Sequence, residues 1–219
     1  MDHVMPPPRG DASAPGAPSA GRRTPGTPAP GRPPELLRPA EGITLRRRSP
    51  AQATALNAAV RANLEHLRPW MEWAAEAPTP ARTVALAVAG VAAWDAGTDF
   101  IYLAALDAEP DRVIGSFGLH RRIGPDALEI GYWVSAEHGR RGIATAAARS
   151  VTAAALALPG IRRVELHCDP ANTASGAVAR RLGFRLDRVV DAPVRAPGET
   201  GRKQVWIRER RPPGPCAVW

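Results

Sequence analysis

The sequence predicts a mixed α/β fold in which helices flank a mostly antiparallel sheet that contains one parallel pair of strands. Apolar runs at residues 100–106, 113–120 and 128–134 are separated by short turns, as in an antiparallel meander. A glycine turn and an alanine-rich helix follow the third run. Residues 164–168 then form the next predicted strand, and the helical crossover makes it parallel to the third one.

The segment before the meander predicts one strand and two helices. Residues 43–46 are expected to form the first strand, and Ser49-Pro50 to open a helix with Ser49 as its cap. Pro69 ends this helix, whose apolar face consists of Leu56, Val60, Leu64 and Leu67. A second helix is expected over residues 79–94, with an apolar side made of Val84, Ala87, Val88 and Val91.

The segment after the glycine turn predicts two helices and three strands. The alanine-rich helix is expected to stop at Pro159-Gly160. Asn172 is expected to cap a further helix that ends at Gly183 in a left-handed conformation. Strands near residues 184–190 and 204–209 complete the predicted sheet.

Composition divides the chain into one domain and two tails. Residues 1–40 are rich in Pro, Gly and Ala, have few large apolar side chains, and are predicted to be disordered. Residues 41–210 are long enough to bury a core of their own. Residues 211–219 are rich in proline and are predicted to be a C-terminal tail.

The charge and cysteine content restrict the function classes. The formal charge is +8, and all but one of the 29 basic residues are Arg, scattered along the chain. This charge suits a cofactor with several phosphates, whereas no nucleic-acid reader motif accompanies it. Cys168 and Cys216 lack metal-ligand spacing, so neither a metal site nor a disulfide framework is expected. No apolar run approaches the roughly 18 residues of a membrane span, and a soluble, cytoplasmic protein is expected.

The turn at residues 139–142 has the features of an anion site. Gly139 and Gly142 let the backbone bend tightly, and the next residues begin a helix whose first amides lack intrahelical partners. Arg140 and Arg141 add positive charge. The sequence contains neither a P-loop motif nor a Gly-x-Gly-x-x-Gly fingerprint. An ordinary strand-to-helix turn with solvated arginines is the alternative interpretation.

Three segments together resemble the GNAT N-acetyltransferases. Residues 139–144 are similar to the loop pattern Gln/Arg-x-x-Gly-x-Gly/Ala of that family, with Gly139 in place of the first side chain. Residues 169–184 are similar to its Asn-x-x-Ser…Leu-Gly-Phe segment. The third segment is the run Glu-Ile-Gly-Tyr-Trp-Val at residues 129–134, which stands in the expected order before the other two. Separately, residues 66–73 resemble the first-helix segment of the RimJ/RimL branch. The resemblance covers about residues 42–209.

The resemblance implies a GNAT-like fold and acetyl-CoA as co-substrate, without a metal. The strands at 128–134 and 164–168 are then expected to splay apart, with pantetheine in the gap and the acetyl carbonyl facing the amide of Val134. Pyrophosphate is expected on the amides that follow residue 139. The implied cofactor-binding residues are Trp133, Val134, Ser135, Arg140, Arg141, Gly142, Ile143, Ala144, Thr145 and Asn172.

Two residues are candidates for the proton transfers. Glu129 is the candidate base, since an amine attacks a thioester only when unprotonated, and Ser175 is the candidate partner of the departing thiolate. A paired surface carboxylate and an ordinary first-turn serine are the alternatives. Trp70 and Trp73 are interpreted as walls of an acceptor pocket, or else as packing residues. Tyr132 and Trp133 must face opposite sides of the sheet, and the sequence does not say which.

The functional hypothesis is direct acetyl transfer from acetyl-CoA to a primary amine, with a protein N-terminal amine as the expected acceptor. An α-amine has a pKa of about 7.7–8.0, against about 10.4 for lysine, so it demands less of a base. Acetylation of a polyamine or an aminoglycoside is the alternative within enzymes. A non-catalytic module that binds acyl-CoA or RNA is the alternative outside them. The protein is expected to be a monomer or a homodimer.

Overall fold

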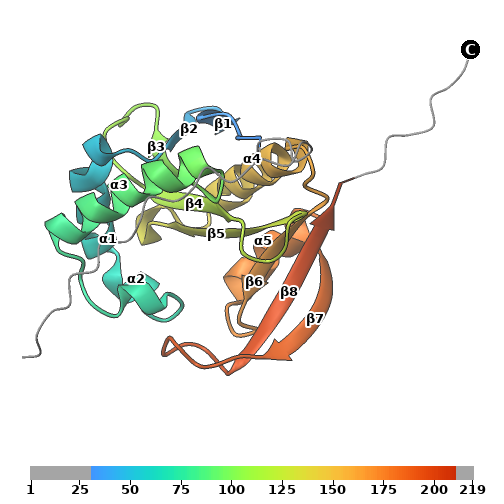
Figure 1. The fold of residues 1–219 in the computed structure, drawn as a ribbon. Helices are drawn as coiled ribbons and strands as arrows, with labels where there is room; N and C mark the ends of the chain where they lie inside the picture. Colours follow the sequence, from blue (N-terminus) through green and yellow to red (C-terminus); the bar gives the residue numbers. More distant parts are fainter. Residues whose placement is uncertain (1–30, 211–219) are drawn as a thin grey trace, which may run out of the picture.

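The computed structural model describes residues 31–210, which form one eight-stranded sheet with helices on both sides (Figure 1). The strand order is β1-β2-β3-β4-β5-β6-β8-β7. Every neighbouring pair is antiparallel except β5 and β6, which are parallel. The strands are β1 Leu36–Ala40, β2 Ile43–Arg47, β3 Asp99–Leu106, β4 Gly115–His120, β5 Ala127–Val134, β6 Arg163–Cys168, β7 Arg185–Asp191 and β8 Arg202–Glu209.

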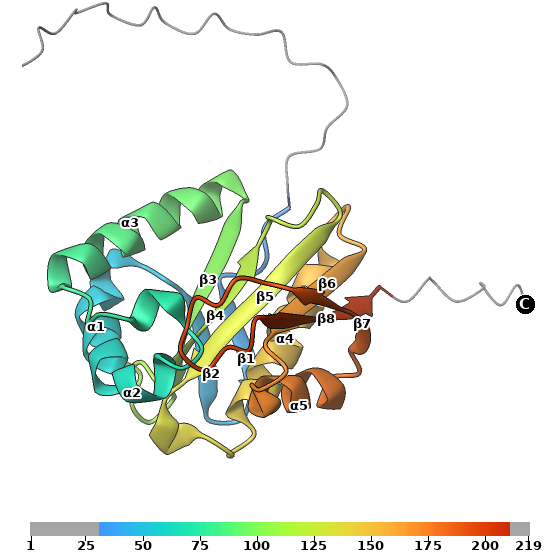
Figure 2. The ribbon, with the colours of Figure 1, turned by 90° about the horizontal axis from the view of Figure 1, so that it is seen from below.

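Five α-helices and three 3-10 turns connect these strands. The helices are α1 Ala53–Ala62, α2 Leu64–Leu67, α3 Pro80–Ala96, α4 Ile143–Ala157 and α5 Thr173–Arg181. The 3-10 turns are η1 Pro50–Gln52, η2 Glu72–Ala74 and η3 Ala136–His138. In Figure 2 the α1–α3 group and the α4–α5 pair lie on opposite sides of the central strands, and the loop between β7 and β8 extends toward α2.

Each side of the sheet has its own apolar cluster. On one side α4 contributes Ala147, Ala148 and Val151, which are fully buried in the cluster that contains Leu128 and Ile130 of β5. These small side chains allow the helix to lie close to the sheet. On the other side α1 and α2 form a smaller cluster with the ends of β3 and β5, made of Leu56, Val60, Leu67, Ala74, Leu103, Val113 and Trp133. Trp133 therefore faces α1, and Tyr132 faces α4.

The predicted fold class is confirmed, including the parallel pair. The helix cap at Ser49 is also confirmed, because its backbone N–H donates to Gln52 and Pro50 opens the first turn. Gly183 ends α5 with φ of +73°, as expected for a left-handed stop.

Three expectations from the sequence are wrong. Residues 36–40 are not part of a tail: they form β1 and pair with β2. The first helix does not continue to residue 68, because Asn63 leaves helical geometry and separates α1 from α2. The apolar side of α3 is misassigned, since Val84 and Val88 are 45% and 54% exposed. Its buried residues are Thr83, Ala87 and Trp94. Residues 1–30 and 211–219 of the predicted tails lie outside the described part.

Candidate functional site

The parallel strands β5 and β6 stay together for only half of the length of β5. Their paired residues run from Ala127 with Arg163 to Ile130 with Leu166. β5 continues to Val134, paired on its other side with β4. Residues 131–134 therefore present a free edge toward β6, which is the splayed arrangement that the resemblance implies.

Backbone alternation decides which groups face this free edge. The amide of Ser135 donates to the carbonyl of Ile114, at 2.8 Å, on the β4 side. Successive residues of a strand point their N–H and C=O groups to opposite sides. The backbone groups of Trp133 therefore also point to β4, whereas those of Tyr132 and Val134 point to the opening. Val134 is thus oriented as expected. The amide of Ser135 is not free, because it bonds to β4, whereas the N–H and C=O groups of Tyr132 are free like those of Val134.

The glycine turn leaves a set of helix amides without partners. Gly142 precedes α4 with φ of +79°, and Arg140 also has a positive φ, of +58°. The first intrahelical bond of α4 runs from the amide of Ala146 to the carbonyl of Gly142. Within residues 31–210 no side chain caps this end, so the amides of Ile143, Ala144 and Thr145 have no partner there and are oriented for an anion.

The surroundings of these amides are open and positively charged. A Cβ atom placed on Gly142 would meet no atom of residues 31–210 within 4 Å, so the backbone at this N-cap is not crowded by the described part of the chain. Arg140 and Arg141 are both exposed beside it. The helix dipole and two guanidinium groups therefore favour a phosphate-bearing ligand here.

The start of α5 lies on the same side of the opening as Tyr132. Asn172 caps the helix by accepting from the amide of Ser175, at 3.1 Å. The hydroxyl of Ser175 is 3.2 Å from that of Tyr132. Burial raises the pKa of Tyr132 to about 12, although the hydrogen bond with Ser175 opposes the shift, so the phenol stays protonated at neutral pH. Burial also raises the pKa of the Cys168 thiol nearby. The contact between Tyr132 and Ser175 was not predicted from the sequence.

Glu129 lies on the opposite side of the sheet, among charged groups. Arg122 donates to both of its carboxylate oxygens, at 2.8 and 2.6 Å, and Nδ1 of His167 is 3.6 Å away. Burial alone would raise the pKa of Glu129. The hydrogen bonds from Arg122 and the charges of His167 and His120 outweigh burial, so the pKa is lowered. Glu129 is therefore an ionised, paired carboxylate.

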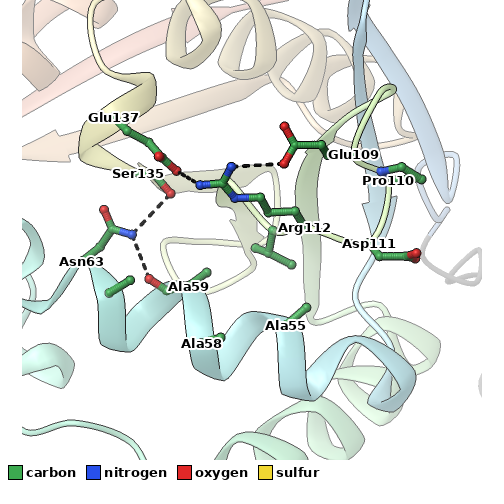
Figure 3. Close-up of a pocket in the computed structure, with 12 residues that line it drawn as sticks. Ala55, Ala58, Ala59, Asn63, Glu109, Pro110, Asp111, Arg112, Ser135 and Glu137 are labelled. Atoms are coloured by element: carbon green, nitrogen blue, oxygen red, sulfur yellow. Dashed lines mark hydrogen bonds and ion pairs between the residues drawn. The ribbon is translucent and has the colours of Figure 1, made fainter.

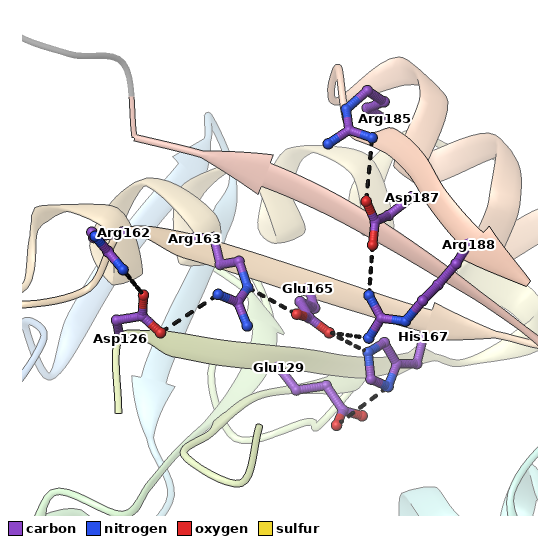
Figure 4. Close-up of polar contacts among 9 residues, drawn as sticks. All are labelled: Asp126, Glu129, Arg162, Arg163, Glu165, His167, Arg185, Asp187 and Arg188. Atoms are coloured by element: carbon purple, nitrogen blue, oxygen red, sulfur yellow. Dashed lines mark hydrogen bonds and ion pairs between the residues drawn. The ribbon is translucent and has the colours of Figure 1, made fainter. Parts of the chain in front are cut away.

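A chain of ion pairs continues from Glu129 along the paired half of β5 and β6 (Figure 4). Nε2 of His167 lies 2.8 Å from the carboxylate of Glu165, which is also bound by Arg163 at 2.9 Å. Arg163 reaches Asp126, which in turn pairs with Arg162. Glu165 is almost completely buried, whereas Arg162 is mostly exposed. The network ties the two parallel strands together where they are still paired.

The two tryptophans predicted for the acceptor site do not share a helical face. Trp70 is half-buried in the turn after α2, and Trp73 is 45% exposed in η2. The β7–β8 loop contacts this segment (Figure 2), since the amide of Gly198 donates to the carbonyl of Pro69 at 2.9 Å. Arg195 of the loop pairs with Glu72 at 3.2 Å. The loop thus bridges from β8 to α2 beside the tryptophans.

A separate pocket of about 540 Å³ lies between α1, the β3–β4 connection and η3 (Figure 3). Alanines of α1 form one wall, and Glu109 and Glu137 pair with Arg112 at its rim. Of the residues predicted for the site, only Ser135 lines this pocket. Its hydroxyl accepts a 3.4 Å hydrogen bond from Asn63, which anchors the end of β5 to α1.

Two structural observations concern residues 31–210 as a whole. These residues contain no group of three or more His, Cys, Asp or Glu residues that could hold a metal ion. Within the same range, no helix is long and apolar enough to cross a membrane.

Comparison with known proteins gives a consistent result. Residues 43–185 match the family model described as an acetyltransferase (GNAT) domain. A search of the curated proteins finds no match.

Similar solved structures include RimL, a ribosomal L7/L12 α-N-protein acetyltransferase in complex with coenzyme A, with a TM-score of 0.72 and 23% identity over 80% of this chain and 98% of that one. Mycobacterium smegmatis RimJ, in complex with CoA-disulfide, has a TM-score of 0.70 and 24% identity over 82% and 89% of the two chains. The microcin C7 self-immunity acetyltransferase MccE, in complex with acetyl-CoA and AMP, has a TM-score of 0.73 and 20% identity over 81% of this chain and 97% of that one.

Proposed function

Because this chain belongs to the GNAT acetyltransferase family, we propose that it transfers the acetyl group of acetyl-CoA to the α-amine of a protein N-terminus. The observation that carries the proposal is the free edge of β5 beside the uncapped amides of α4. The distance along the chain from Val134 to Gly142 is short, so an extended ligand can contact both. Transfer occurs by direct attack within a ternary complex.

The cofactor is proposed to lie along the opening between β5 and β6. Its pantetheine pairs with the free backbone groups of Tyr132 and Val134, in the manner of an added strand. Its pyrophosphate binds the amides of Ile143, Ala144 and Thr145, with Arg140 and Arg141 beside it. The backbone groups of Trp133 and Ser135 hold this strand to β4, Gly142 provides the turn before α4, and Asn172 borders the site from α5. RimL and MccE, which have similar folds, are known in complex with coenzyme A and acetyl-CoA respectively.

A backbone amide and a side-chain hydroxyl are proposed to act on the thioester. The amide of Val134 stabilises the oxyanion. Ser175, hydrogen-bonded to the protonated phenol of Tyr132, supplies a proton to the departing thiolate. The base is proposed to act from the α1 side of the sheet, where the candidate expected from the sequence, Glu129, has a lowered pKa and is bound by Arg122.

The proposed acceptor enters between α2 and the β7–β8 loop, with Trp70 and Trp73 at its entrance. A polyamine would need a carboxylate-rich entrance, yet Glu72 is paired with Arg195 there. This pairing supports a peptide or another acceptor with a single amine. RimL, named for the α-amine of ribosomal protein L7/L12, has the same fold. An N-terminus of an intracellular protein as acceptor would place the reaction in the cytoplasm.

Calorimetry with acetyl-CoA tests the cofactor site. Gly142→Asp places a carboxylate beside the helix amides, and we expect it to weaken binding at least tenfold through repulsion of the phosphates. Gly160→Asp is the matched control, because Gly160 has a similar φ of +76°, open surroundings, and lies just after the opposite end of α4. Equal affinity of the two variants would contradict the placement. Absence of binding by the unmodified protein would contradict the function.

An acceptor screen tests the substrate class. Thiol release is measured with acetyl-CoA and either short peptides with free N-termini, the same peptides blocked at the N-terminus, or spermidine. We expect turnover with the free peptides only. Turnover of spermidine with no turnover of any peptide would replace the protein acceptor by a small amine.

A further inference from the structure

His120 lies at the end of β4 on the α1 side of the sheet, opposite Glu129 in the β4–β5 register. Its Nδ1 is 2.5 Å from Oδ1 of Asp99, the first residue of β3. The imidazole is only partly exposed, at 22%. A carboxylate that contacts one imidazole nitrogen holds the ring in a fixed orientation.

Two glycines make the space that the ring occupies. Gly118 and Gly131 are directly paired across β4 and β5. A side chain at Gly118 would come within 2.8 Å of Nε2 of His120, and one at Gly131 within 3.6 Å of the same atom. Nε2 therefore lies above both glycines, toward β5. Gly131 is the first residue of β5 beyond its pairing with β6.

The contact with Asp99 determines which nitrogen of the neutral ring is basic. The carboxylate accepts the hydrogen of Nδ1, so the lone pair of the neutral ring resides on Nε2. Among residues 31–210 no hydrogen bond involves Nε2. A basic nitrogen with a fixed direction thus faces the start of the free edge of β5.

Glu129 is less well arranged to accept a proton. Arg122 occupies both of its oxygens, and His167 lies beside one of them. These contacts favour the ionised form, which makes the carboxylate a weaker base than an unpaired one. A proton acceptor also needs a lone pair that no other donor occupies, and no hydrogen bond among residues 31–210 involves Nε2 of His120.

We propose that His120, and not Glu129, is the base that removes the proton from the acceptor amine, and that Asp99 is its positioning residue. This inference rests on the proposed function. The amine nitrogen attacks the thioester carbon, the N–C bond forms and the C–S bond breaks. The electron pair leaves with the sulfur, which receives a proton from the Ser175 side. One proton of the attacking nitrogen passes to Nε2 and then to solvent.

The test compares steady-state rates of His120→Ala, His120→Gln and Glu129→Gln with an N-terminal peptide as acceptor. Loss of a general base reduces kcat/KM by about 10²–10⁴-fold. We expect this loss for both His120 variants, unchanged affinity for acetyl-CoA by calorimetry, and partial recovery of His120→Ala by added imidazole. Arg82→Ala, at an exposed residue of α3 outside the proposed site, is the control and is expected to keep full activity.

Asp99→Asn tests the positioning role by a readout that a merely structural role would not change. In the ¹⁵N spectrum of the unmodified protein, the neutral ring of His120 should carry its hydrogen on Nδ1. The amide in the variant can donate to Nδ1, so the hydrogen should move to Nε2 and kcat/KM should fall about 10²-fold or more.

Two outcomes would overturn the inference while leaving the proposed function intact. The first is a His120→Ala variant that keeps more than a third of wild-type kcat/KM, while Glu129→Gln loses at least 10²-fold. The second is a neutral ring with its hydrogen on Nε2 in the unmodified protein. A protein that binds no acetyl-CoA would instead contradict the proposed function, and the inference with it.

Discussion

The two halves of β5 differ in what lies on their β6 side. Residues 127–130 pair with β6, and ion pairs centred on Glu165 connect the two strands beside them. Residues 131–134 have no strand partner on that side among residues 31–210, and the free N–H and C=O groups of Tyr132 and Val134 face an opening. One half satisfies its backbone within the protein, while the other leaves it available to a ligand. The comparison indicates that stability and binding are assigned to successive segments of one strand.

The largest expected effect comes from removing one amide on the open half. Val134→Pro deletes the N–H that faces the opening and leaves the ladder with β4 intact. Loss of one oxyanion donor lowers kcat by about 10²–10³-fold. Steady-state kinetics measure the effect, and the urea midpoint shows whether folding is preserved.

Ser135→Pro is the matched control for this variant. It deletes the neighbouring N–H, which donates to Ile114 within the sheet. We therefore expect Ser135→Pro to lower the free energy of unfolding more than Val134→Pro does. Equal losses of stability in the two variants would contradict the difference between the hydrogen-bonded amide of Ser135 and the free amide of Val134.

Glu165→Ala tests the paired half. The carboxylate is 3% exposed and bonds Arg163 and His167, so its removal leaves both of these groups without their partner. We expect the free energy of unfolding to fall by about 2–3 kcal/mol, measured by urea denaturation. Acetyl-CoA affinity should change little. A large loss of affinity with unchanged stability would contradict the division between the two halves.

The pH dependence of stability tests the carboxylate at the boundary between the halves. The pKa of Glu129 is lower in the folded protein than its ordinary value of 4.5. The group therefore stabilises the fold above about pH 4.5, and this contribution is lost as the pH falls through the folded value. The difference in unfolding free energy between wild type and Glu129→Gln should be constant above about pH 5.5 and shrink in acid. A difference that grows in acid would contradict the lowered pKa.

Arg162→Ala should have the smallest effect. Its side chain is 81% exposed and pairs with Asp126 at the outer end of the ion-pair chain. Exposed pairs are screened by water and contribute little. We expect the urea midpoint to stay within experimental error. A loss as large as that of Glu165→Ala would mean that the network acts as one unit.

Sequence reasoning predicted the fold well because each element has a local signal. Ser49-Pro50, Asn172 and Gly183 mark helix ends by their own backbone preferences, and the structure has these residues in those roles. The failures occurred where a tertiary partner decided the outcome. Val84 and Val88 have the spacing of a buried face, but α3 buries Thr83 and Trp94 instead. Thr83 is buried because Asn57 of α1 donates to its hydroxyl.

The candidate site was predictable only in part for the same reason. The glycine turn and the start of α5 are continuous segments, so the sequence shows their anion-binding and capping residues together. His120, Asp99 and Glu129 come from three strands, and only the β3–β4–β5 register brings them side by side. The sequence could not show that Tyr132, and not Trp133, contacts Ser175, because this depends on which face of β5 meets α5.

The sequence by itself determined the order of the elements from β2 onward apart from the break between α1 and α2, the glycine turn before α4, and the resemblance to the family. These depend on local backbone preferences and on segments read continuously. Tertiary structure alone decided where β5 and β6 part, which amides face the opening, and that Arg122 holds Glu129 while Asp99 orients His120. The reason is physical: strand register and charge pairing are set by contacts between residues far apart in the chain, and no local pattern encodes them.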